Sequence, residues 1–479
     1  MALSPFEIKL NPYLKANSPI QITVLTDNRL TERAIPDTYC NGWRLYGGII
    51  RPVLLCYRPK NRLEHVTIRT FHIQENTFDL AFSFKQIGKT PDHLSLEIIT
   101  PEGQPFIRHT FKSIISDSLY KIRIHNTHPW TPETPYLYQI KLIANFDGNL
   151  FTKEFKKGFM QVTTSKNNIL LNGKPYYLRG ISTHEGVDNK GPLSNKQEKL
   201  ADFIDLKRLN VNFLRVPHYP QPEYVYTLCD SLGILVMDEI PAWKTSPRFL
   251  GSRDGKSFAT EYLSKMITTH GNYTSVALWS FGNEFHSFRS NVSNYIKHLS
   301  AYAKQADLHF RPSTYCSYFY HYDKAYEYVD IISVNEYFGW HIGDLEMLIP
   351  ILKKIQKKWP DKPLIISEVG CSSQMGLRNA KAKLAGKITS MLKKDYSEDH
   401  QALYLRSHLT TLWDNRDLCQ GTVVWNYTDY HTPRKKYQTK EMPPWISGFG
   451  LVNLQRKKKL AYWEVQKMYG KIKDFDLGE

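Results

Sequence analysis

From residue 162 onward, short apolar runs alternate with longer stretches of helical periodicity, and this alternation constrains the fold more than any other feature of the sequence. Turn residues bound each run, which is typical of a strand buried on both faces. Eight such strands, each with a following helix or room for one, predict a closed (β/α)₈ TIM barrel. The predicted strands are residues 176–183, 212–217, 234–239, 276–282, 313–319, 330–335, 363–368 and 421–426. The predicted helices are residues 195–209, 222–232, 258–269, 288–306, 343–358, 397–414 and 459–472.

Two of these runs end in a glutamate next to turn residues. Residues 276–284 are Val-Ala-Leu-Trp-Ser-Phe-Gly-Asn-Glu, and residues 363–370 are Pro-Leu-Ile-Ile-Ser-Glu-Val-Gly. A carboxylate at the C-terminal end of a barrel strand lies where barrel enzymes carry out their chemistry. A single glutamate would be interpreted as a solvated surface group. Two in matching contexts favour a carboxylate pair for acid/base and nucleophilic work on a glycosidic bond.

The residues before the barrel alternate with period two and not with helical period. Across residues 59–161 the pattern predicts a β-sandwich of immunoglobulin type, although the cysteine pair of that fold is missing. Its predicted strands are residues 66–73, 78–84, 94–99, 120–124 and 136–143. Residues 1–58 also contain alternating runs, at 20–25 and 53–55, with Gly47-Gly48 as a turn signal. They too are predicted to be β-rich.

The charge is strongly basic, with 63 Lys and Arg against 46 Asp and Glu and a net charge of +17. Such a balance is compatible with nucleic acid or a membrane surface as partner. The basic clusters are short, however, and no nucleic-acid motif accompanies them, so solvated helix faces are the preferred interpretation. Aromatic residues make up 13% of the chain, which suits stacking on sugar rings as well as core packing.

The cysteines and the apolar runs indicate in which cellular compartment the protein is expected. The six cysteines show neither close pairs nor metal-ligand spacing, which predicts reduced, mostly buried thiols. No run reaches the roughly 18 apolar residues of a membrane helix. The N-terminus has no basic region followed by an apolar stretch, so a cytoplasmic location is expected, although a missing start could hide a signal peptide.

The strand-end residues resemble glycoside hydrolase family 2, which includes β-glucuronidases, β-galactosidases and β-mannosidases. The resemblance covers almost the whole chain, and its motifs together are specific. Residues 46–51 resemble the end of the family's N-terminal sugar-binding jelly roll, and residues 170–180 its entry into the barrel. The barrel motifs are residues 184–185 (His-Glu), 212–220 (Asn-Phe-Leu-Arg-Val-Pro-His-Tyr-Pro), 238–241 (Asp-Glu-Ile-Pro), 279–284 (Trp-Ser-Phe-Gly-Asn-Glu) and 366–370 (Ile-Ser-Glu-Val-Gly).

The resemblance implies a domain order and catalytic roles. Residues 1–58 would be a partial jelly roll, 59–161 the immunoglobulin-like domain and 162–479 the catalytic barrel. Glu284 would be the general acid/base and Glu368 the nucleophile of a retaining exo-β-glycosidase, with a covalent glycosyl-enzyme intermediate. As the acid, Glu284 needs a raised pKa to hold its proton. Asn283 would hold a sugar hydroxyl.

Other strand-end residues are implied to surround the sugar. His184 and His218 are expected to bind hydroxyls, although a lone His is more often structural. Tyr337 is expected to hydrogen-bond Glu368, and Trp340 and Trp425 to form walls of the pocket. Two further residues keep alternative interpretations. Arg215 would be buried against a carboxylate, and Glu239 would be a wall or a metal ligand. No cofactor is expected, and an activating Mg²⁺, as in some β-galactosidases of the family, stays open.

The sequence departs from the family at its start. About 58 residues stand where a complete jelly roll is usual, so a fragment, a misplaced start and a split gene are all open. A half jelly roll should leave an unpaired sheet edge and exposed apolar surface. The residues left to reach the sugar from this region are Asn41, Trp43 and Arg44.

The second departure concerns the sugar. β-Glucuronidases of the family carry an Asn-x-Lys pair for the sugar carboxylate, and the matching place here is Ser447-Gly448-Phe449. Arg434, Lys435 and Lys436 are weaker substitutes. A β-galactosidase-like enzyme is therefore favoured, with a β-glucuronidase-like enzyme, which the run at 335–340 resembles, or an inactive carbohydrate-binding relic as alternatives. A carbohydrate substrate, no nucleic acid or membrane partner, and possible homo-oligomers complete the expectation.

Overall fold

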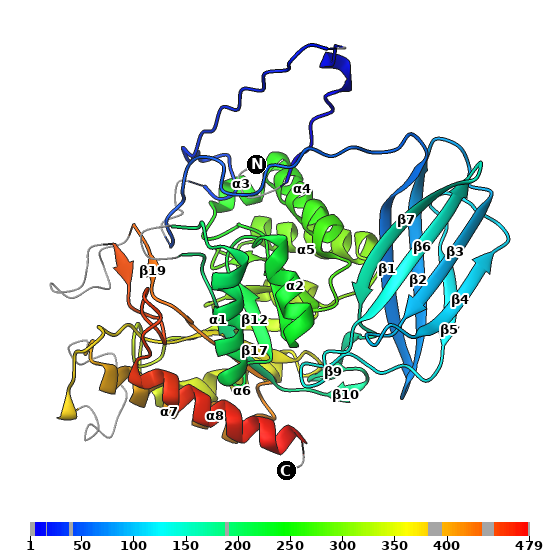
Figure 1. Ribbon diagram of the computed structural model, residues 1–479. Coiled ribbons are helices and arrows are strands. Elements are labelled where there is room, and N and C mark those ends of the chain that lie inside the picture. The colour runs from blue at the N-terminus through cyan, green and yellow to red at the C-terminus, as the bar shows by residue number, and fades with distance from the viewer. Residues whose placement is uncertain are drawn as a thin grey trace.

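The computed structural model describes residues 5–15, 17–37, 42–186, 191–381, 395–433 and 445–477. Its C-terminal part is a closed barrel of parallel strands with helices around it (Figure 1). Each predicted barrel strand is present. The strands are β11 (Leu178–Ser182), β12 (Phe213–Val216), β13 (Leu235–Glu239), β14 (Val276–Asn283), β15 (Ser313–Ser317), β16 (Ile332–Asn335), β17 (Leu364–Val369) and β18 (Gly421–Val424).

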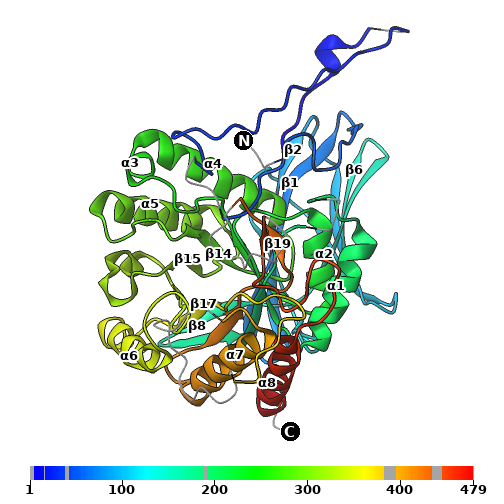
Figure 2. The same ribbon diagram turned by 90° about the vertical axis from the view of Figure 1, so that its left-hand side faces the viewer.

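The predicted helices also form, and they surround the strands in Figure 2. Local signals set their ends. The side chain of Asn195 caps the first turn of α1 together with Glu198, and Gly233 ends α2 in the left-handed conformation. After β15 the predicted room for a helix holds two short 3₁₀ segments instead, η2 (Tyr320–Tyr322) and η3 (Lys324–Tyr328). The α-helices are α1 (Lys196–Arg208), α2 (Glu223–Leu232), α3 (Pro247–Leu250), α4 (Arg253–His270), α5 (Ser290–Ala306), α6 (Leu348–Lys358), α7 (Glu398–Asp414) and α8 (Leu460–Leu477).

Alternate residues of each barrel strand point to opposite faces, and both faces are buried. In β13, Leu235 and Met237 join the core cluster of the barrel interior, whereas Val236 packs in the cluster shared with the helices. This burial on both faces explains why the strands appear in the sequence as continuous apolar runs. It also leaves the strand ends as the places where polar side chains gather.

Two antiparallel sheets lie beside the barrel and share one core of buried residues (Figure 1). The first has the order β1-β2-β5 and the second β4-β3-β6-β7. The predicted strands of this region are present, but two more, β4 and β7, were not predicted. Both are edge strands whose side chains are mostly exposed, so they lack the apolar alternation that marks a strand. The strands are β1 (Arg62–Gln74), β2 (Thr77–Ile87), β3 (His93–Ile99), β4 (Pro105–Phe111), β5 (Tyr120–Ile124), β6 (Tyr138–Phe146) and β7 (Asn149–Lys157).

The prediction of β structure before residue 59 is wrong for the part of it that the structure describes. Residues 5–15, 17–37 and 42–58 contain one 3₁₀ turn, η1 (Asn11–Tyr13), and no strand. The alternating runs are extended but solvent-exposed, with Leu25 94% and Leu55 88% exposed. An alternating pattern forms a strand only when another strand pairs with it, and none of the described residues pairs with these runs. The partial jelly roll is thus not confirmed, and the immunoglobulin type of the sandwich also stays a prediction.

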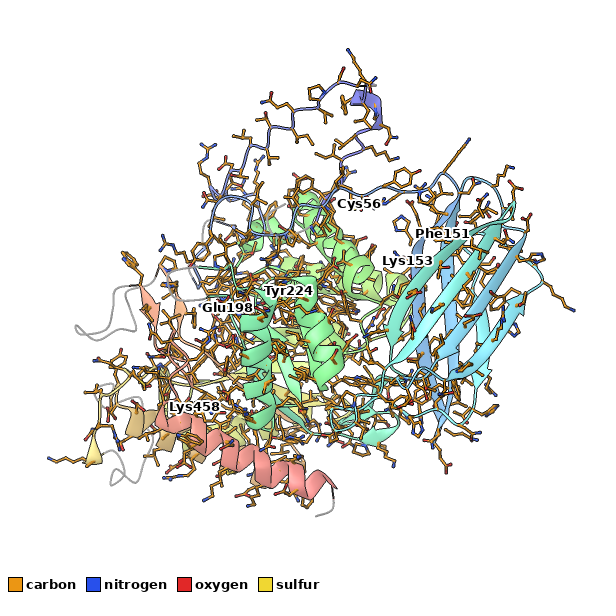
Figure 3. The ribbon with its side chains drawn as sticks, in the orientation of Figure 1. Cys56, Phe151, Lys153, Glu198, Tyr224 and Lys458 are labelled. Carbon is orange, nitrogen blue, oxygen red and sulfur yellow. The ribbon has the colours of Figure 1, made fainter. Side chains whose placement is uncertain are left out.

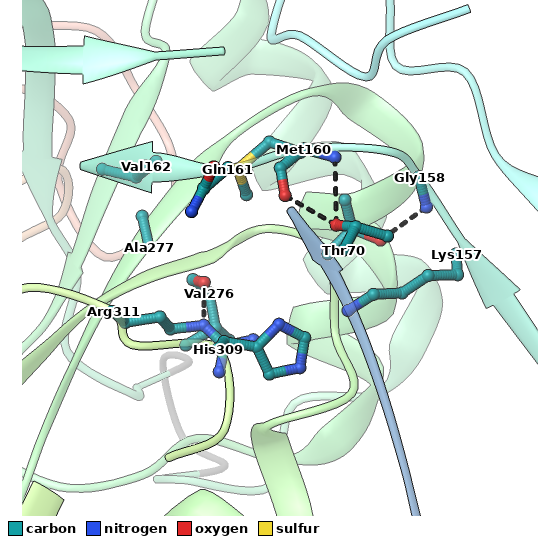
Figure 4. A pocket seen from close by; sticks show the side chains of 11 residues that line it. Thr70, Lys157, Gly158, Met160, Gln161, Val162, Val276, Ala277, His309 and Arg311 are labelled. Atoms are coloured by element: carbon teal, nitrogen blue, oxygen red, sulfur yellow. Dashed lines mark hydrogen bonds between the residues drawn. The ribbon is translucent and has the colours of Figure 1, made fainter. Parts of the chain in front are cut away.

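The sandwich docks on the end of the barrel where the strands begin. A three-stranded sheet of β8 (Val162–Ser165), β9 (Asn168–Leu171) and β10 (Lys174–Pro175) connects the two parts. A cavity of about 20 Å³ lies at the junction, with Lys157, His309 and Arg311 among its lining residues (Figure 4). Val276 and Ala277, the first residues of β14, also line it. Because Asn283 is at the other end of β14, this cavity is remote from the strand-end glutamates.

The described cysteines are free, as predicted. Cys229, Cys316, Cys371 and Cys419 are buried, whereas Cys56 is exposed on the N-terminal segment (Figure 3). Cys40 lies outside the described residues. Across the described ranges, no helix has the length and apolar character needed to cross a membrane.

Candidate active site

The two predicted glutamates stand at the C-terminal ends of β14 and β17. Gly282, with φ of 122°, and Glu284, with φ of 52°, turn the chain sharply as β14 ends. The backbone N–H of Glu284 donates to the carbonyl of Cys316 on β15, 2.9 Å away, which fixes the turn. Glu368 lies within β17 and is 4% exposed. The barrel therefore brings both carboxylates to one end, as the sequence predicts.

A hydrogen-bond network joins the two glutamates. Asn335 Nδ2 donates to Glu284 Oε1 at 3.0 Å and to Asn283 Oδ1 at 3.0 Å. Arg215 donates to the same Asn283 Oδ1 at 2.8 Å and to Glu368 Oε1 at 2.6 Å. Asn283 Oδ1 thus links the Asn335–Glu284 contacts to the Arg215–Glu368 contacts. The Nδ2 of Asn283 is buried without a hydrogen-bond partner. A buried amide donor left open beside two carboxylates is suited to a ligand hydroxyl.

Arg215 is fully buried and pairs with a second carboxylate, as the sequence analysis expected. Its Nη2 lies 3.0 Å from Glu239 Oε2, and both side chains are completely enclosed. Glu239 also accepts from Ser280 at 2.8 Å, and His218 Nδ1 lies 2.7 Å from Glu239 Oε1. Burial opposes ionisation of Glu239, but Arg215 and His218 outweigh it and lower its pKa to about 2. Glu239 is therefore an ionised counter-charge.

The surroundings of Glu368 raise its pKa. Burial raises the pKa of Glu368 to about 7, and the charge of Glu284 adds to that shift. Arg215 opposes the rise, as does Tyr337, whose hydroxyl donates to Glu368 Oε2 at 2.6 Å. The predicted hydrogen bond from Tyr337 is therefore present. It favours the ionised form that a nucleophile needs.

Glu284 has the opposite balance. Burial opposes its ionisation, but the ammonium group of Lys244, 2.9 Å from Glu284 Oε2, and the hydrogen bond from Asn335 outweigh burial, so the pKa of Glu284 is lowered. The expectation of a raised pKa at Glu284 is thus wrong for the site without substrate. The reason is Lys244, which no motif pointed to and which only the turn after β13 brings to this carboxylate.

His184, His218 and Trp425 meet in an aromatic cluster above the network. The ring of His218 stacks on Trp425 at 5.5 Å, and the ring of His184 lies 5.2 Å from Trp425. Trp43, from the N-terminal segment, completes the cluster at 5.1 Å from His218. Both ring nitrogens of His184 and the Nε1 of Trp43 are buried without a hydrogen-bond partner. Burial, with His218 and Arg215 nearby, keeps the pKa of His184 well below its usual value, so this ring is neutral.

The ring of Trp340 packs against aromatic rings outside the cluster of His184, His218 and Trp425. It is 1% exposed, and its ring contacts those of Tyr396 at 5.4 Å and Phe449 at 6.3 Å. Phe449 in turn lies 6.2 Å from the ring of Tyr337. Trp340 therefore supports the Tyr337 side of the site through Phe449, whereas Trp425 packs directly against Arg215, whose guanidinium lies 6.0 Å from its ring.

The sequence analysis also named residues that could reach the sugar from the N-terminal region or from a later loop, and it named Glu239 as a possible metal ligand. Asn41, Arg434, Lys435 and Lys436 lie outside the described residues. Arg44 packs over the ring of Tyr46 at 5.5 Å, whereas Trp43 reaches the aromatic cluster. Glu239 does not fit a metal ligand, because its oxygens already accept hydrogen bonds from Arg215 and Ser280. Within the described ranges, no group of three or more His, Cys, Asp or Glu side chains is arranged to hold a metal.

This fold, with two strand-end glutamates joined by one buried polar network, defines the class: a (β/α)₈-barrel glycoside hydrolase. Residues 162–474 match the family model described as glycosyl hydrolases family 2, TIM barrel domain. The chain belongs to that family, and it is a glycoside hydrolase that acts on carbohydrate.

The chain is also similar to individual proteins, which match from 81% to 98% of its length. A β-glucuronidase of Sus scrofa is 26% identical, with 98% of this chain and 74% of the relative covered. A β-glucuronidase of Streptococcus agalactiae is 28% identical, over 81% of this chain and 65% of the relative. The solved structure of a β-D-glucuronidase of Dictyoglomus thermophilum superposes with a TM-score of 0.80 at 22% identity, covering 93% of this chain and 78% of the other. At that identity the superposition concerns the fold alone.

Proposed function

We propose that the chain is a retaining exo-β-glycosidase whose substrates are β-glucuronides. The observation that carries the proposal is the network that joins Glu284 and Glu368 through Asn335, Asn283 and Arg215. The relatives named above are β-glucuronidases, which supports this sugar over the β-galactoside that the sequence analysis favoured. Nothing in these relatives supports the preference for galactose.

In the proposed mechanism the two glutamates divide the work. The ionised Glu368 attacks the anomeric carbon and forms a covalent ester while the glycosidic C–O bond breaks. Protonated Glu284 gives its proton to the leaving oxygen. Glu284, now ionised, then takes a proton from water, whose oxygen attacks the same carbon and releases Glu368. Tyr337 and Arg215 stabilise the charge on Glu368 before attack and after release.

The proposed sugar site consists of the buried groups that have open hydrogen-bonding capacity. Asn283 Nδ2, His184 and Trp43 Nε1 would hydrogen-bond to hydroxyls, and a bond that strengthens in the transition state lowers the barrier. His218 and Trp425 would provide the wall beside Arg215. We propose Trp340 as a supporting wall behind Tyr337. We also propose that residues 59–161 form an immunoglobulin-like domain and 162–479 the catalytic domain.

A neutral β-hexoside is the second candidate, because of residues 447–449. Ser447 and Phe449 are buried, and the Gly448 carbonyl accepts a hydrogen bond from Lys459 Nζ at 3.0 Å. These three residues offer no cation to a sugar carboxylate. The Lys459 ammonium is itself paired with Asp429 at 2.8 Å. A galactoside has no carboxylate to satisfy, which favours this second candidate.

A panel of aryl β-glycosides tests the proposal: glucuronide, galactoside, mannoside, glucoside and fucoside. We expect turnover of the glucuronide, and a loss of about 10³-fold or more in kcat for Glu284→Gln and for Glu368→Gln. Glu336→Gln is the matched control, because burial raises the pKa of Glu336 to about 8 and leaves it an uncharged carboxyl in the same barrel. Turnover of the galactoside alone would favour the second candidate. No turnover by the folded protein would favour the carbohydrate-binding relic and overturn the proposal.

A further inference from the structure

Lys244 is bound to the carboxylate that the mechanism uses as its acid. Its Nζ lies 2.9 Å from Glu284 Oε2, while Glu284 Oε1 accepts from Asn335. The backbone N–H of Lys244 donates to the carbonyl of Asn283 at 2.9 Å. The turn that follows β13 is thereby fixed to the end of β14. A backbone hydrogen bond therefore helps to hold Lys244 beside Glu284.

The surroundings of Lys244 form a partly open site. Its side chain is 32% exposed, whereas that of Glu284 is 14% and that of Glu368 is 5% exposed. The ammonium group lies 5.0 Å from the ring of Trp243 and 5.7 Å from the ring of Tyr318. A partly exposed cation close to two aromatic rings is suited to a ring-shaped ligand that carries an anion.

The chemistry of the proposed reaction locates this site relative to the substrate. Glu368 must approach the anomeric carbon, and Glu284 must approach the oxygen that leaves. Lys244 contacts Glu284, which is the more exposed of the two glutamates. We therefore expect Lys244 to lie beside the leaving group. The sugar that is attacked occupies the buried side, next to Glu368 and the His184 cluster.

The contact with Lys244 favours the ionised form of Glu284, which cannot donate a proton. The pKa of Glu284 is lowered and that of Glu368 is raised to about 7, so protonation of Glu368 is favoured over protonation of Glu284. Catalysis needs the proton on Glu284 and the charge on Glu368. An anion that draws the ammonium away from Glu284 removes the largest attraction that stabilises its charge. The titratable groups that interact with Glu284 are Lys244, His218, Glu368, Tyr318, Tyr320 and Tyr337.

We propose that Lys244 is a specificity-determining residue that binds an anionic group, a carboxylate or a sulfate, on the leaving-group side of the substrate. The same contact releases Glu284 to donate its proton, so an acidic leaving group is both bound and activated. The inference rests on the proposed function. The net charge of +17 agrees with it, because a basic protein concentrates anionic substrates around itself.

The test compares leaving groups that differ in charge but little in shape. For the glycoside that the panel identifies, kcat/KM is measured with 4-carboxyphenyl, 4-sulfophenyl and 4-carbamoylphenyl leaving groups. In the wild type we expect a preference of about tenfold for the charged groups over the carbamoyl group. Lys244→Met should reduce this ratio to within about twofold, and Lys244→Arg should restore most of it. A preference for the carboxylate alone would narrow the anion to that group.

The control is Lys141→Met, because Lys141 has a similar exposure of 28% and pairs with Glu154 on the sandwich. In Lys141→Met, the ratio of kcat/KM for the charged leaving groups to that for the carbamoyl group should equal the wild-type ratio. With the neutral leaving group, Lys244→Met should also move the alkaline fall of kcat/KM to higher pH, since Glu284 then keeps its proton longer. If the Lys244 variants do not fold, added NaCl should reduce the wild-type preference, because salt screens a partly exposed pair.

Two results would overturn the inference alone: equal rates for charged and neutral leaving groups in the wild type, or an unchanged ratio in folded Lys244→Met. No turnover of any leaving group by the folded wild type would overturn the proposed function as well. The two failures are thus distinguished by whether any aryl glycoside is hydrolysed.

Discussion

At the scale of single residues, Glu284 and Glu368 are chemically identical and are made different by their neighbours. Glu284 faces the ammonium of Lys244 and the amide of Asn335, which favour its charge. Glu368 is more deeply buried and feels the charge of Glu284, which raises its pKa to about 7 despite Arg215 and Tyr337. Two carboxyls in one buried network share their protons as a pair. Small changes around either one therefore move the proton between them.

Replacement of Tyr337 by Phe tests this sensitivity. The hydroxyl of Tyr337 lowers the pKa of Glu368, so Tyr337→Phe should raise that pKa further above about 7. The proposed mechanism needs an ionised Glu368, so activity should be lost as pH falls through this pKa. We expect the acidic limb of the kcat/KM profile to move up by about one pH unit.

Tyr295→Phe is the control for Tyr337→Phe. It removes a buried hydroxyl that donates to the Phe281 carbonyl at 3.1 Å, outside the carboxyl network. Its acidic limb should match that of the wild type. An acidic limb that stays in place in Tyr337→Phe would contradict the assignment of Glu368 as the group that must be ionised.

At the scale of elements, the ends of β13 and β14 carry the site. Gly282, the residue before the last one of β14, has φ of 122°, a conformation that residues with a Cβ rarely adopt. The chain there passes so close to the turn after β13 that a Cβ on Gly282 would lie 2.4 Å from the Ala242 carbonyl oxygen. This close approach brings Lys244 and Glu284 together. Glycine is thus required by two independent features at one position.

Gly282→Ala should therefore damage activity more than folding. The added methyl group must push the β13 turn away or move Asn283 and Glu284, and a displacement of about 1 Å in a catalytic group costs roughly 100-fold in rate. We expect kcat/KM to fall by about this factor in protein that circular dichroism shows to be folded. Gly103→Ala is the matched control, because Gly103 has φ of 84° with nothing within 4 Å of an added Cβ. Near-normal activity in folded Gly282→Ala would show that the turn tolerates the shift.

At the scale of the whole molecule, the sandwich and the barrel meet through buried charges at the end remote from the glutamates. Lys157, on β7, is 3% exposed, and its Nζ donates to the Asn272 carbonyl at 2.9 Å. Arg69, on β1, donates to the Leu308 carbonyl at 2.6 Å. Lys157 and Arg311 line the same cavity (Figure 4). Burial, helped by Arg311, lowers the pKa of Lys157 to about 7. The junction thus carries a lysine that titrates near neutrality.

This lysine makes the junction more stable at higher pH. The folded-state pKa of about 7 lies below the unfolded value of about 10.4, so the unfolded chain binds more protons between these values. Stability should therefore rise with pH across this window. Lys157→Met should remove that contribution. The Tm of the wild type minus that of the variant should increase from pH 7 to pH 9.5, as measured by calorimetry.

Lys153→Met is the control for Lys157→Met. Lys153 is an exposed residue of the same strand β7 (Figure 3), and its substitution should leave the pH dependence of Tm unchanged. A Tm difference between wild type and Lys157→Met that stays constant with pH would show that Lys157 does not change its protonation on unfolding in this range.

The sequence alone determined the barrel, its order of elements and the two glutamates. Strands buried on both faces must be continuous apolar runs, and a parallel barrel brings all their C-terminal ends together, so Glu284 and Glu368 could be located without coordinates. Edge strands such as β4 and β7 escaped prediction because their exposed faces carry no such pattern. The runs at 20–25 and 53–55 were misinterpreted because alternation indicates a face that needs a partner strand, and the sequence does not say whether one is present. Only the tertiary structure decided that Lys244 meets Glu284 and that Trp43 reaches His184, because a turn and an irregular segment set these contacts. The order of the two carboxyl pKa values followed from those contacts, since electrostatic effects depend on distance and burial in space and not on spacing along the chain.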